Sequence, residues 1–180
     1  VEVSLSITNT HAVVEWIHNR ELDLGMAGAP VSLEGLKSFP YVTDEIVVIA
    51  SANHTLAAKR RVALRDLEGT DFILREPGSA TRQTAEECLE SHGIGINVVM
   101  ELGSNEAVKR AVAAGLGIGL MSRFGITPDT IAGMITALPV RGWRCQRALT
   151  VFYRDDKHLP PAQREFLRFL KEERPLPPVS

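Results

Sequence analysis

The feature that most constrains the fold is a repeated alternation of apolar strand patterns and helix patterns. Residues 72–74 have the pattern of a buried strand, residues 79–92 that of a helix, and residues 96–102 that of a second strand. A further helix begins after Ser104, and residues 117–121 return as another buried strand. Strands separated by helices are typical of parallel sheets whose connections cover the faces of the sheet. The alternation therefore predicts an α/β fold.

The two ends of the chain extend this pattern. Residues 1–7 alternate apolar and polar side chains, which predicts a half-exposed strand, and Thr10 is placed to cap the following helix. Residues 22–27 form a short apolar strand that we expect to run parallel to the first. The helix between them should bury Val13, Val14 and Ile17.

Two more apolar strands, residues 46–50 and 149–153, bracket the middle third of the chain and suit two crossings between lobes. Pro160 and Pro161 open a final amphipathic helix. Residues 175–178 end it as a loose tail. The expected apolar face of that helix carries Ala162, Phe166, Phe169 and Leu170.

Composition narrows the classes of protein that this chain can represent. A hydrophobic content of 44% with 23% charged residues describes a folded globular protein, and a net charge of −2 gives no bulk attraction to nucleic acid. Two cysteines without metal-ligand spacing fit a reducing cytoplasm, and no apolar run reaches membrane-spanning length. The five histidines have no metal-ligand spacing, and no catalytic triad pattern is present, so we expect no cofactor, no metal and no enzymatic activity.

Residues 74–82 predict an anion-binding turn, because an apolar strand leads through Pro77 and Gly78 into a helix opened by Ser79. A helix N-terminus presents unpaired N–H groups and the positive end of the helix dipole. Gly78 lets a ligand approach the backbone, and a bound anion would explain a positive charge in the first helical turn. The side chains expected to contact the anion are Arg75, Ser79, Thr81 and Arg82. The alternative interpretation is an ordinary helix cap and turn with a solvated arginine.

Other candidate positions are less specific. Ser104 and Asn105 open a helix as Ser79 does, and capping alone would explain them. Gly28 and Ala29 follow a strand, where open α/β sheets bind ligands, although a tight turn also uses such residues. The glycines of residues 115–119 lie between a helix and a strand, the reverse of the order in a dinucleotide-binding motif, so we interpret them as packing residues. The basic groups at residues 59–61 and at Arg141, Arg144 and Arg147 are interpreted as solvated.

Four segments occur in the order found in the effector-binding domain of LysR-type transcriptional regulators, and the chain resembles the CbbR-like branch of that family. They are residues 19–27, 44–57, 74–82, and 100–109 followed by 114–122, and one departure is that Ala80 replaces the usual glycine of the turn. The resemblance implies a type 2 periplasmic-binding-protein fold, with two Rossmann-like lobes joined by two crossing strands. It also implies the boundaries: lobe one is 1–46 plus 148–174, lobe two is 47–147, and 175–180 is a C-terminal tail.

The resemblance also implies a function. A small anionic effector would bind in the cleft between the lobes, at Gly28, Ala29, Arg75, Gly78, Ser79, Thr81, Arg82, Ser104 and Asn105. The domain would self-associate as a dimer or tetramer through residues 1–7 and 96–102, and would reach DNA only through an upstream winged helix-turn-helix. The first central strand and its helix would also precede residue 1, which implies a fragment of a cytoplasmic regulator. Two alternatives remain: a solute-binding protein of a transporter, and an enzyme on the same fold.

Overall fold

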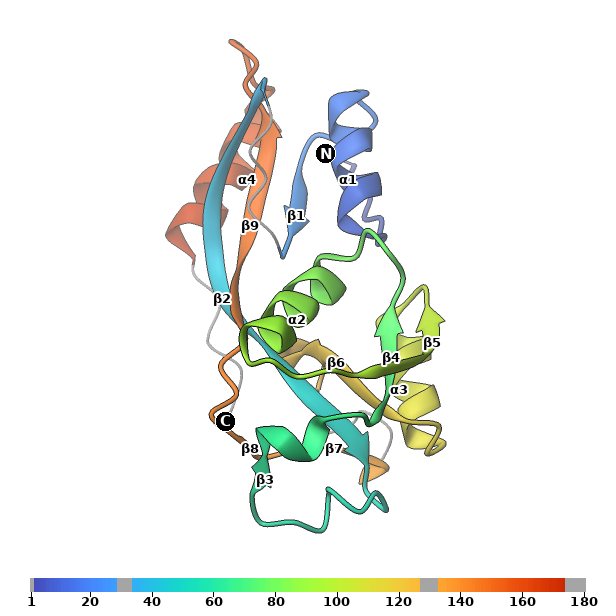
Figure 1. The fold of residues 1–180 in the computed structure, drawn as a ribbon. Helices are drawn as coiled ribbons and strands as arrows, with labels where there is room; N and C mark the ends of the chain where they lie inside the picture. The colour runs from blue at the N-terminus through green and yellow to red at the C-terminus, as the bar shows by residue number, and fades with distance from the viewer. Residues whose placement is uncertain (1, 29–33, 127–132, 174–180) are drawn as a thin grey trace. The chain divides into compact units, whose positions relative to one another are not determined.

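The computed structural model describes residues 2–28, 34–126 and 133–173. The chain divides into two compact units, Val1–Asp44 with Arg147–Ser180, and Glu45–Gln146. Figure 1 shows that two long strands, β2 (Leu36–Ser51) and β9 (Gln146–Arg154), run from one unit into the other. The predicted fold class, α/β with two lobes joined by two crossing strands, is confirmed.

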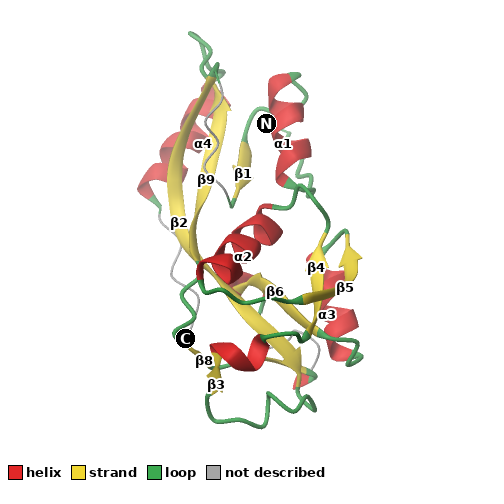
Figure 2. Ribbon diagram, viewed as in Figure 1, coloured by secondary structure: helices red, strands yellow, loops and turns green. Residues whose placement is uncertain are grey.

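Helices and strands alternate along most of the chain (Figure 2). Besides β2 and β9, the elements in chain order are α1 (Thr10–His18), β1 (Gly25–Ala27), β3 (Val62–Ala63), the short helix η1 (Leu64–Leu67), β4 (Asp71–Arg75), α2 (Ala80–Ser91), β5 (Asn97–Leu102), α3 (Asn105–Ala113), β6 (Ile118–Ser122), η2 (Arg123–Gly125), β7 (Ile135–Ala137), β8 (Val140–Arg141) and α4 (Pro161–Glu172).

Unit Glu45–Gln146 is built on a mixed sheet. β4 pairs in parallel with both β5 and β6, as the strand–helix–strand alternation predicts, whereas β2 pairs antiparallel with β6 and β7. The hydrogen-bonded path runs β1-β9-β2-β6-β4-β5, and it is continuous because β2 belongs to both units. β5 is the last strand of this path and therefore an edge strand.

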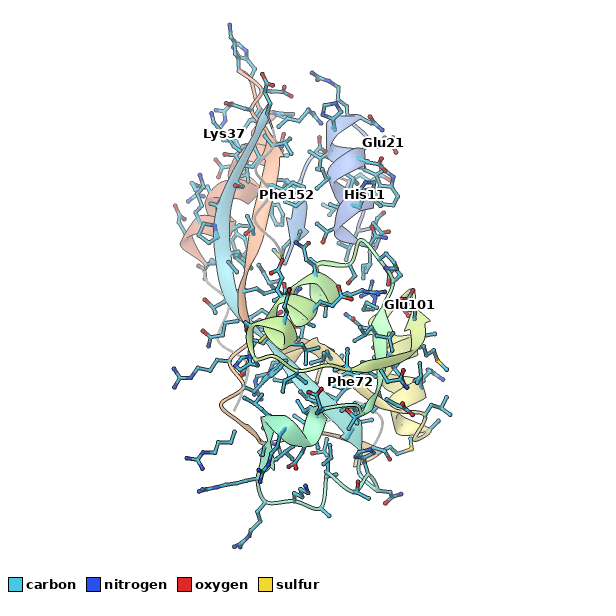
Figure 3. All side chains as sticks on the ribbon, viewed as in Figure 1. His11, Glu21, Lys37, Phe72, Glu101 and Phe152 are labelled. Carbon is cyan, nitrogen blue, oxygen red and sulfur yellow. The ribbon has the colours of Figure 1, made fainter. Side chains whose placement is uncertain are left out.

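Helices cover both faces of this sheet, and the alternation of side chains along β2 separates the two cores. Ile46, Val48 and Ala50 pack in the core beneath α2, while Val47 and Ile49 pack in the core beneath α3. Successive side chains of a strand point to opposite faces, so a continuous apolar run is what a strand buried on both faces requires. The fully buried Phe72 on β4 belongs to the core beneath α2 and is labelled in Figure 3.

The glycines between α3 and β6 have packing roles, as interpreted from the sequence. Gly115 has φ of +76°, a left-handed conformation that ends α3 without strain on a side chain. A Cβ atom on Gly117 would lie 2.8 Å from the Asp71 carbonyl oxygen, so the backbones of β6 and β4 approach more closely than any larger residue permits.

The smaller unit is organised around β9. Phe152 packs with Val13 and Ile17 of α1 on one face, and the neighbouring side chains Val151 and Tyr153 pack against α4 on the other. Figure 1 shows α1 beside β1 and α4 behind β9. In α1, Val13 and Ile17 are buried as expected, and Val14 is partly buried.

Three predictions for the start of the chain are wrong. Glu2–Asn9 form no strand, and Val3, Leu5 and Ile7 are 85–92% exposed, because none of the described strands pairs with this segment to cover one of its faces. Consequently β1 has no parallel partner there and pairs antiparallel with β9. The cap of α1 is Asn9 rather than Thr10, since the Asn9 side chain accepts a hydrogen bond from the Ala12 N–H at 3.0 Å.

The predicted face of α4 is only partly right: Leu170 is buried as expected, but the other three predicted residues are not. Phe166 and Phe169 are about half exposed and stack on each other with ring centroids 6.3 Å apart, and Ala162 is exposed as well. The buried side chains are Gln163, Leu167 and Leu170, and the Gln163 amide donates to the Asp23 carbonyl at 2.9 Å. Because this buried face contains the polar Gln163, the apolar pattern of the sequence does not indicate it. The proposed tail, 175–178, lies outside the described residues.

Candidate functional site

The turn between β4 and α2 has the geometry that residues 74–82 predict. Gly78 has φ of +86°, which favours glycine, and the Ser79 N–H donates to the Glu76 carbonyl at 3.2 Å. The Glu76 N–H donates to the Leu102 carbonyl at the end of β5, at 3.1 Å. The turn is therefore fixed to the neighbouring strand, and α2 begins at a defined position beyond the end of β4.

Ser79 and Thr81 are 4% and 7% exposed. Ser79 is the N-cap residue of α2, but its side chain makes no capping hydrogen bond. Among the described residues, neither hydroxyl has a hydrogen-bond partner. These two nearly buried residues stand at the N-cap and in the first turn of α2, whose first N–H groups have no acceptor within the helix.

Arg75 ties the start of α3 to the end of β4. Its Nε and Nη2 donate to the two carboxylate oxygens of Glu76 at 2.7 and 2.9 Å, and its Nη1 donates to Asn105 Oδ1 at 2.9 Å. A bidentate pair of this kind neutralises and orients the guanidinium. Arg75 therefore links Glu76 to Asn105 at the start of α3, and this connection is called the brace below.

Arg82 is also engaged by acidic groups. Its Nε donates to Glu86 at 2.8 Å, and its Nη1 donates to Glu101 at 2.7 Å. Figure 3 labels Glu101 on β5. The hydrogen bond to Glu86, and after it the one to Glu101, raises the pKa of Arg82. These two carboxylates compensate the charge in the first turn of α2, so this charge does not by itself imply a bound anion.

Ser104 and Asn105 begin α3 next to this turn. The Ser104 hydroxyl oxygen accepts from the Ala107 N–H at 3.1 Å, so Ser104 is a true side-chain cap. Because β4 and β5 are parallel neighbours, the turns after them, which lead into α2 and α3, lie at the same edge of the sheet. Open α/β sheets bind ligands beyond the carboxyl ends of their strands. The structure thus brings together the predicted residues Arg75, Gly78, Ser79, Thr81, Arg82, Ser104 and Asn105.

Gly28 lies in the other unit, directly after β1, and Ala29 lies outside the described residues. The neighbour of Gly28 is Arg147, whose side chain is only 10% exposed and pairs with Asp44. The interpretation of Arg147 as a solvated residue is therefore wrong. No local pattern indicates this pair, because the acidic partner Asp44 is far from Arg147 along the chain.

No group of three or more metal-ligating side chains lies together in the part of the chain that the structure describes. None of the described helices is long and apolar enough to cross a membrane. What the edge of the sheet offers is a set of hydrogen-bond donors, the hydroxyl groups of Ser79 and Thr81 and the first N–H groups of α2, whereas the guanidinium groups of Arg75 and Arg82 are already engaged by neighbouring side chains. Such a set can bind and orient a polar molecule.

Comparison with known proteins identifies the family. The family model of the LysR substrate binding domain matches residues 1–175, so the chain belongs to this family of effector-binding domains of LysR-type transcriptional regulators. The transcriptional regulator CbbR of Rhodospirillum rubrum is 33% identical over 171 residues, covering 95% of this chain and 56% of that protein. The transcriptional activator CmpR of Synechocystis is 34% identical over 170 residues, covering 94% of this chain and 56% of that protein. The resemblance to the CbbR-like branch is confirmed.

Solved structures agree with this assignment. The regulatory domain of CcmR from Synechocystis, solved in complex with 2-PG, has a TM-score of 0.86 at 32% identity and covers 95% of this chain and 82% of that chain. The effector-binding domain of QuiR in complex with shikimate has a TM-score of 0.80 at 18% identity, covers 90% of this chain and 76% of that chain, and supports the fold alone. The chain spans just over half the length of the curated relatives named above.

Proposed function

We propose that this domain senses a small anionic metabolite and thereby controls DNA binding and transcription by a cytoplasmic LysR-type regulator. The DNA-binding part would be a winged helix-turn-helix outside this chain. The two CbbR and CmpR relatives are transcriptional regulators, and the CcmR regulatory domain binds 2-PG. We propose no chemistry on the ligand.

One observation carries the proposal: Ser79 and Thr81 are nearly buried, and their hydroxyl groups make no hydrogen bond among the described residues. Neither hydroxyl oxygen is fully enclosed, because the one enclosed side-chain nitrogen or oxygen without a partner among the described residues belongs to Arg147, so a ligand oxygen can reach both hydroxyls. The adjacent N-terminus of α2 favours a negative charge. Hydroxyls, helix N–H groups and the turn at Gly78 together suit a carboxylate, a phosphate or another oxyanion.

Binding would regulate the protein through a difference in affinity. A ligand shifts an equilibrium between two conformations only by the ratio of its affinities for them. The brace from Arg75 to Asn105 and the bond from the Glu76 N–H to Leu102 connect the starts of α2 and α3. A ligand bound at this edge would therefore act on both helices at once.

Thermal-shift screening of inorganic oxyanions, phosphorylated sugars and small carboxylates tests the proposal. A ligand at a hundredfold its Kd should stabilise the fold by about 2.7 kcal/mol. Ser79→Ala and Thr81→Val should weaken a hit about tenfold each. Ser91→Ala, at the other end of α2, is the matched control and should leave the Kd unchanged. A hit that is equally tight in all three variants would remove the site from consideration.

We also propose that the domain self-associates through the edge strand β5. Val98 and Val99 on this strand are about 40% exposed, and an apolar edge strand is a ready surface for another chain. Val99→Asp should shift the protein toward monomer in sedimentation. Leu116→Asp changes another exposed apolar residue and is the matched control. An unchanged dimer in Val99→Asp would place the interface elsewhere.

A further inference from the structure

Unit Glu45–Gln146 carries a group of arginines that the fold assembles from two distant parts of the chain. β3 pairs in parallel with β8, and this pairing joins the segment that follows residue 59 to the segment that precedes β9. Figure 3 shows long side chains with nitrogen at their ends projecting outward from the part of this unit that holds β3 and β8. The arginines of this group are all exposed and are called the basic patch below: Arg60, Arg61, Arg65, Arg141 and Arg144.

The ladder between β3 and β8 brings the two halves of the basic patch together. Arg141 is the register partner of Ala63, and Arg61 lies two residues before Ala63. Given the spacing of strands and the rise per residue, the Cα atoms of Arg61 and Arg141 are about 8 Å apart. Val62 is completely buried between them, so the exposed arginines lie on the outer side of this ladder.

The turn after β8 brings the remaining members near. A Cβ atom on Gly142 would lie 3.5 Å from Leu64 Cδ1, in ordinary van der Waals contact. Arg141 directly precedes Gly142 and Arg65 directly follows Leu64, so the two arginines start from neighbouring backbone positions. Arg144 follows the same turn. The basic patch is therefore one continuous surface, although its members come from segments about 80 residues apart.

Acidic side chains do not compensate the basic patch. In the described part of the chain, none of its arginine side chains forms a hydrogen bond or an ion pair. Asp66 accepts a hydrogen bond from the Ala63 N–H at 2.9 Å and pairs with Lys59 at 3.1 Å, so these two charges cancel. The carboxylate of Glu68 accepts instead from the Gly95 N–H at 3.0 Å. A chain with a net charge of −2 thus holds five arginines together without acidic partners.

The chemistry of the basic patch favours a phosphate backbone over a protein partner. The large exposed apolar side chains of the described residues all lie elsewhere, whereas stable protein interfaces have an apolar core within a polar rim. Nucleic acids need no apolar core, because neutralising their phosphates releases condensed counterions. All five cations are arginines, whose guanidinium can donate two parallel hydrogen bonds to one phosphate.

We propose that the basic patch binds the phosphate backbone of double-stranded DNA without reading its sequence. The inference goes beyond the proposed function, and its choice of DNA rests on it, because a regulator held at a promoter has DNA at high local concentration. The basic patch then adds affinity that is independent of sequence to the contacts of the separate DNA-binding part. The net charge of −2 does not oppose this, since phosphate contacts depend on local charge.

Fluorescence anisotropy of the full chain with a labelled DNA duplex of arbitrary sequence tests the proposal. If about four phosphates are contacted, the Kd should weaken about a hundredfold between about 50 and 200 mM potassium chloride. The double variant Arg61→Gln/Arg141→Gln should bind at least about tenfold more weakly at the lower salt concentration. Its slope of log affinity against log salt should be smaller in magnitude by about 2. Both positions are exposed, so unchanged melting curves should accompany this loss.

The matched control removes the same two charges elsewhere, as Arg110→Gln/Arg164→Gln. Both residues are exposed. Arg110 lies on α3, whose buried side chains belong to the core on the opposite face from the core that contains Val62, and Arg164 lies on α4 in the other unit. The control should bind the duplex within about twofold of the wild type and keep its salt slope. An equal loss in the control would mean that net charge, and not the basic patch, governs binding.

The outcomes separate this inference from the proposed function. An unchanged salt slope in Arg61→Gln/Arg141→Gln, or no binding of the duplex at low salt, would overturn the inference. A poly-glutamate of equal charge that competes as well as unlabelled duplex would assign the basic patch to an acidic protein and overturn the choice of DNA. The titration contains no effector, so each of these results leaves effector sensing to the thermal-shift screen. Conversely, a failed screen leaves the binding of DNA by the basic patch to this titration.

Discussion

The thiols of Cys88 and Cys145 each hydrogen-bond to the backbone of the other's segment. Cys88 Sγ lies 3.8 Å from the carbonyl oxygen of Arg144, and Cys145 Sγ lies 3.5 Å from that of Thr84, one turn before Cys88 in α2. Both side chains belong to the core beneath α2, and burial raises the pKa of the Cys88 thiol. This pair fastens α2 to the segment that leads into β9.

Both thiols should therefore react slowly in the native protein. The reactive species is the thiolate, and burial suppresses both its formation and its access to a reagent. We expect modification by a disulfide reagent such as dithionitrobenzoate to be about a hundredfold or more slower than in denaturant. Counting released thionitrobenzoate before and after unfolding measures this. Fast native labelling of either thiol would mean that α2 opens readily from the core.

The raised pKa of Cys88 also predicts a dependence of stability on pH. The unfolded thiol loses its proton near its ordinary value of about 8.5, while the folded thiol keeps it to higher pH. The contribution is therefore fully present below the unfolded pKa and is lost as pH rises through the folded pKa, by at most about 1.4 kcal/mol per pH unit. Urea melts of the wild type and of Cys88→Ala between pH 7 and 10 compare the two slopes. Parallel slopes would contradict this linkage.

Gly117 should tolerate no side chain. A Cβ atom there would press on the Asp71 backbone carbonyl, which cannot rotate away as a flexible side chain can. Gly117→Ala should therefore force β6 away from β4 and destabilise the fold by about 1–3 kcal/mol. Gly103→Ala is the matched control, because a Cβ there meets nothing within 4 Å. Chemical denaturation should show the loss for Gly117→Ala alone, and equal stability of both variants would disprove the close approach.

The elements that sequence predicts best are those whose pattern is local. The apolar run of β2 follows from the alternation of side chains along a strand. The turn at Gly78 follows from its need for a positive φ. The cap at Ser104 follows from the hydroxyl group at the start of a helix. In the described part of the segment 1–7, which starts at Glu2, the predicted strand is absent because a strand needs a partner strand, and an alternating pattern alone does not provide one. Along α4 the apolar pattern predicts the burial of Leu170 but not that of Gln163, which depends on a hydrogen bond to the distant Asp23 carbonyl.

The same distinction applies to the candidate site. Ser79, Thr81 and Ser104 were identified from their positions at the starts of helices. The acidic partners of Arg82 and Arg147 were missed, because Glu101 and Asp44 come from strands that only the folded sheet brings near them. Charge pairing between distant positions leaves no period in the sequence. Whether an arginine is held by a distant carboxylate or is free to bind a ligand therefore cannot be predicted from the residues next to it in the sequence.

Ser104 and Ser79 should differ in their effect on stability although both begin a helix. Ser104 accepts a hydrogen bond from the Ala107 N–H, whereas Ser79 makes no capping bond. Ser104→Ala should cost about 1 kcal/mol, and Ser79→Ala no more than about 0.5 kcal/mol. Ser79→Ala thus tests ligand contact with little change in folding. Equal losses in thermal denaturation would show that Ser79 caps α2 in solution.

Arg82→Ala should lower stability as well as alter ligand binding. The arginine joins α2 to β5 through Glu101 and to the end of β4 through the Arg75 carbonyl at 3.1 Å. Losing these partly exposed charged bonds should cost about 1–2 kcal/mol. A double-mutant cycle with Glu101→Ala should then give a coupling of roughly 0.5–1 kcal/mol, because the two changes remove the same contact. Additive effects would mean that the pair contributes nothing measurable, and would return Arg82 to the role of an anion contact that the sequence suggests.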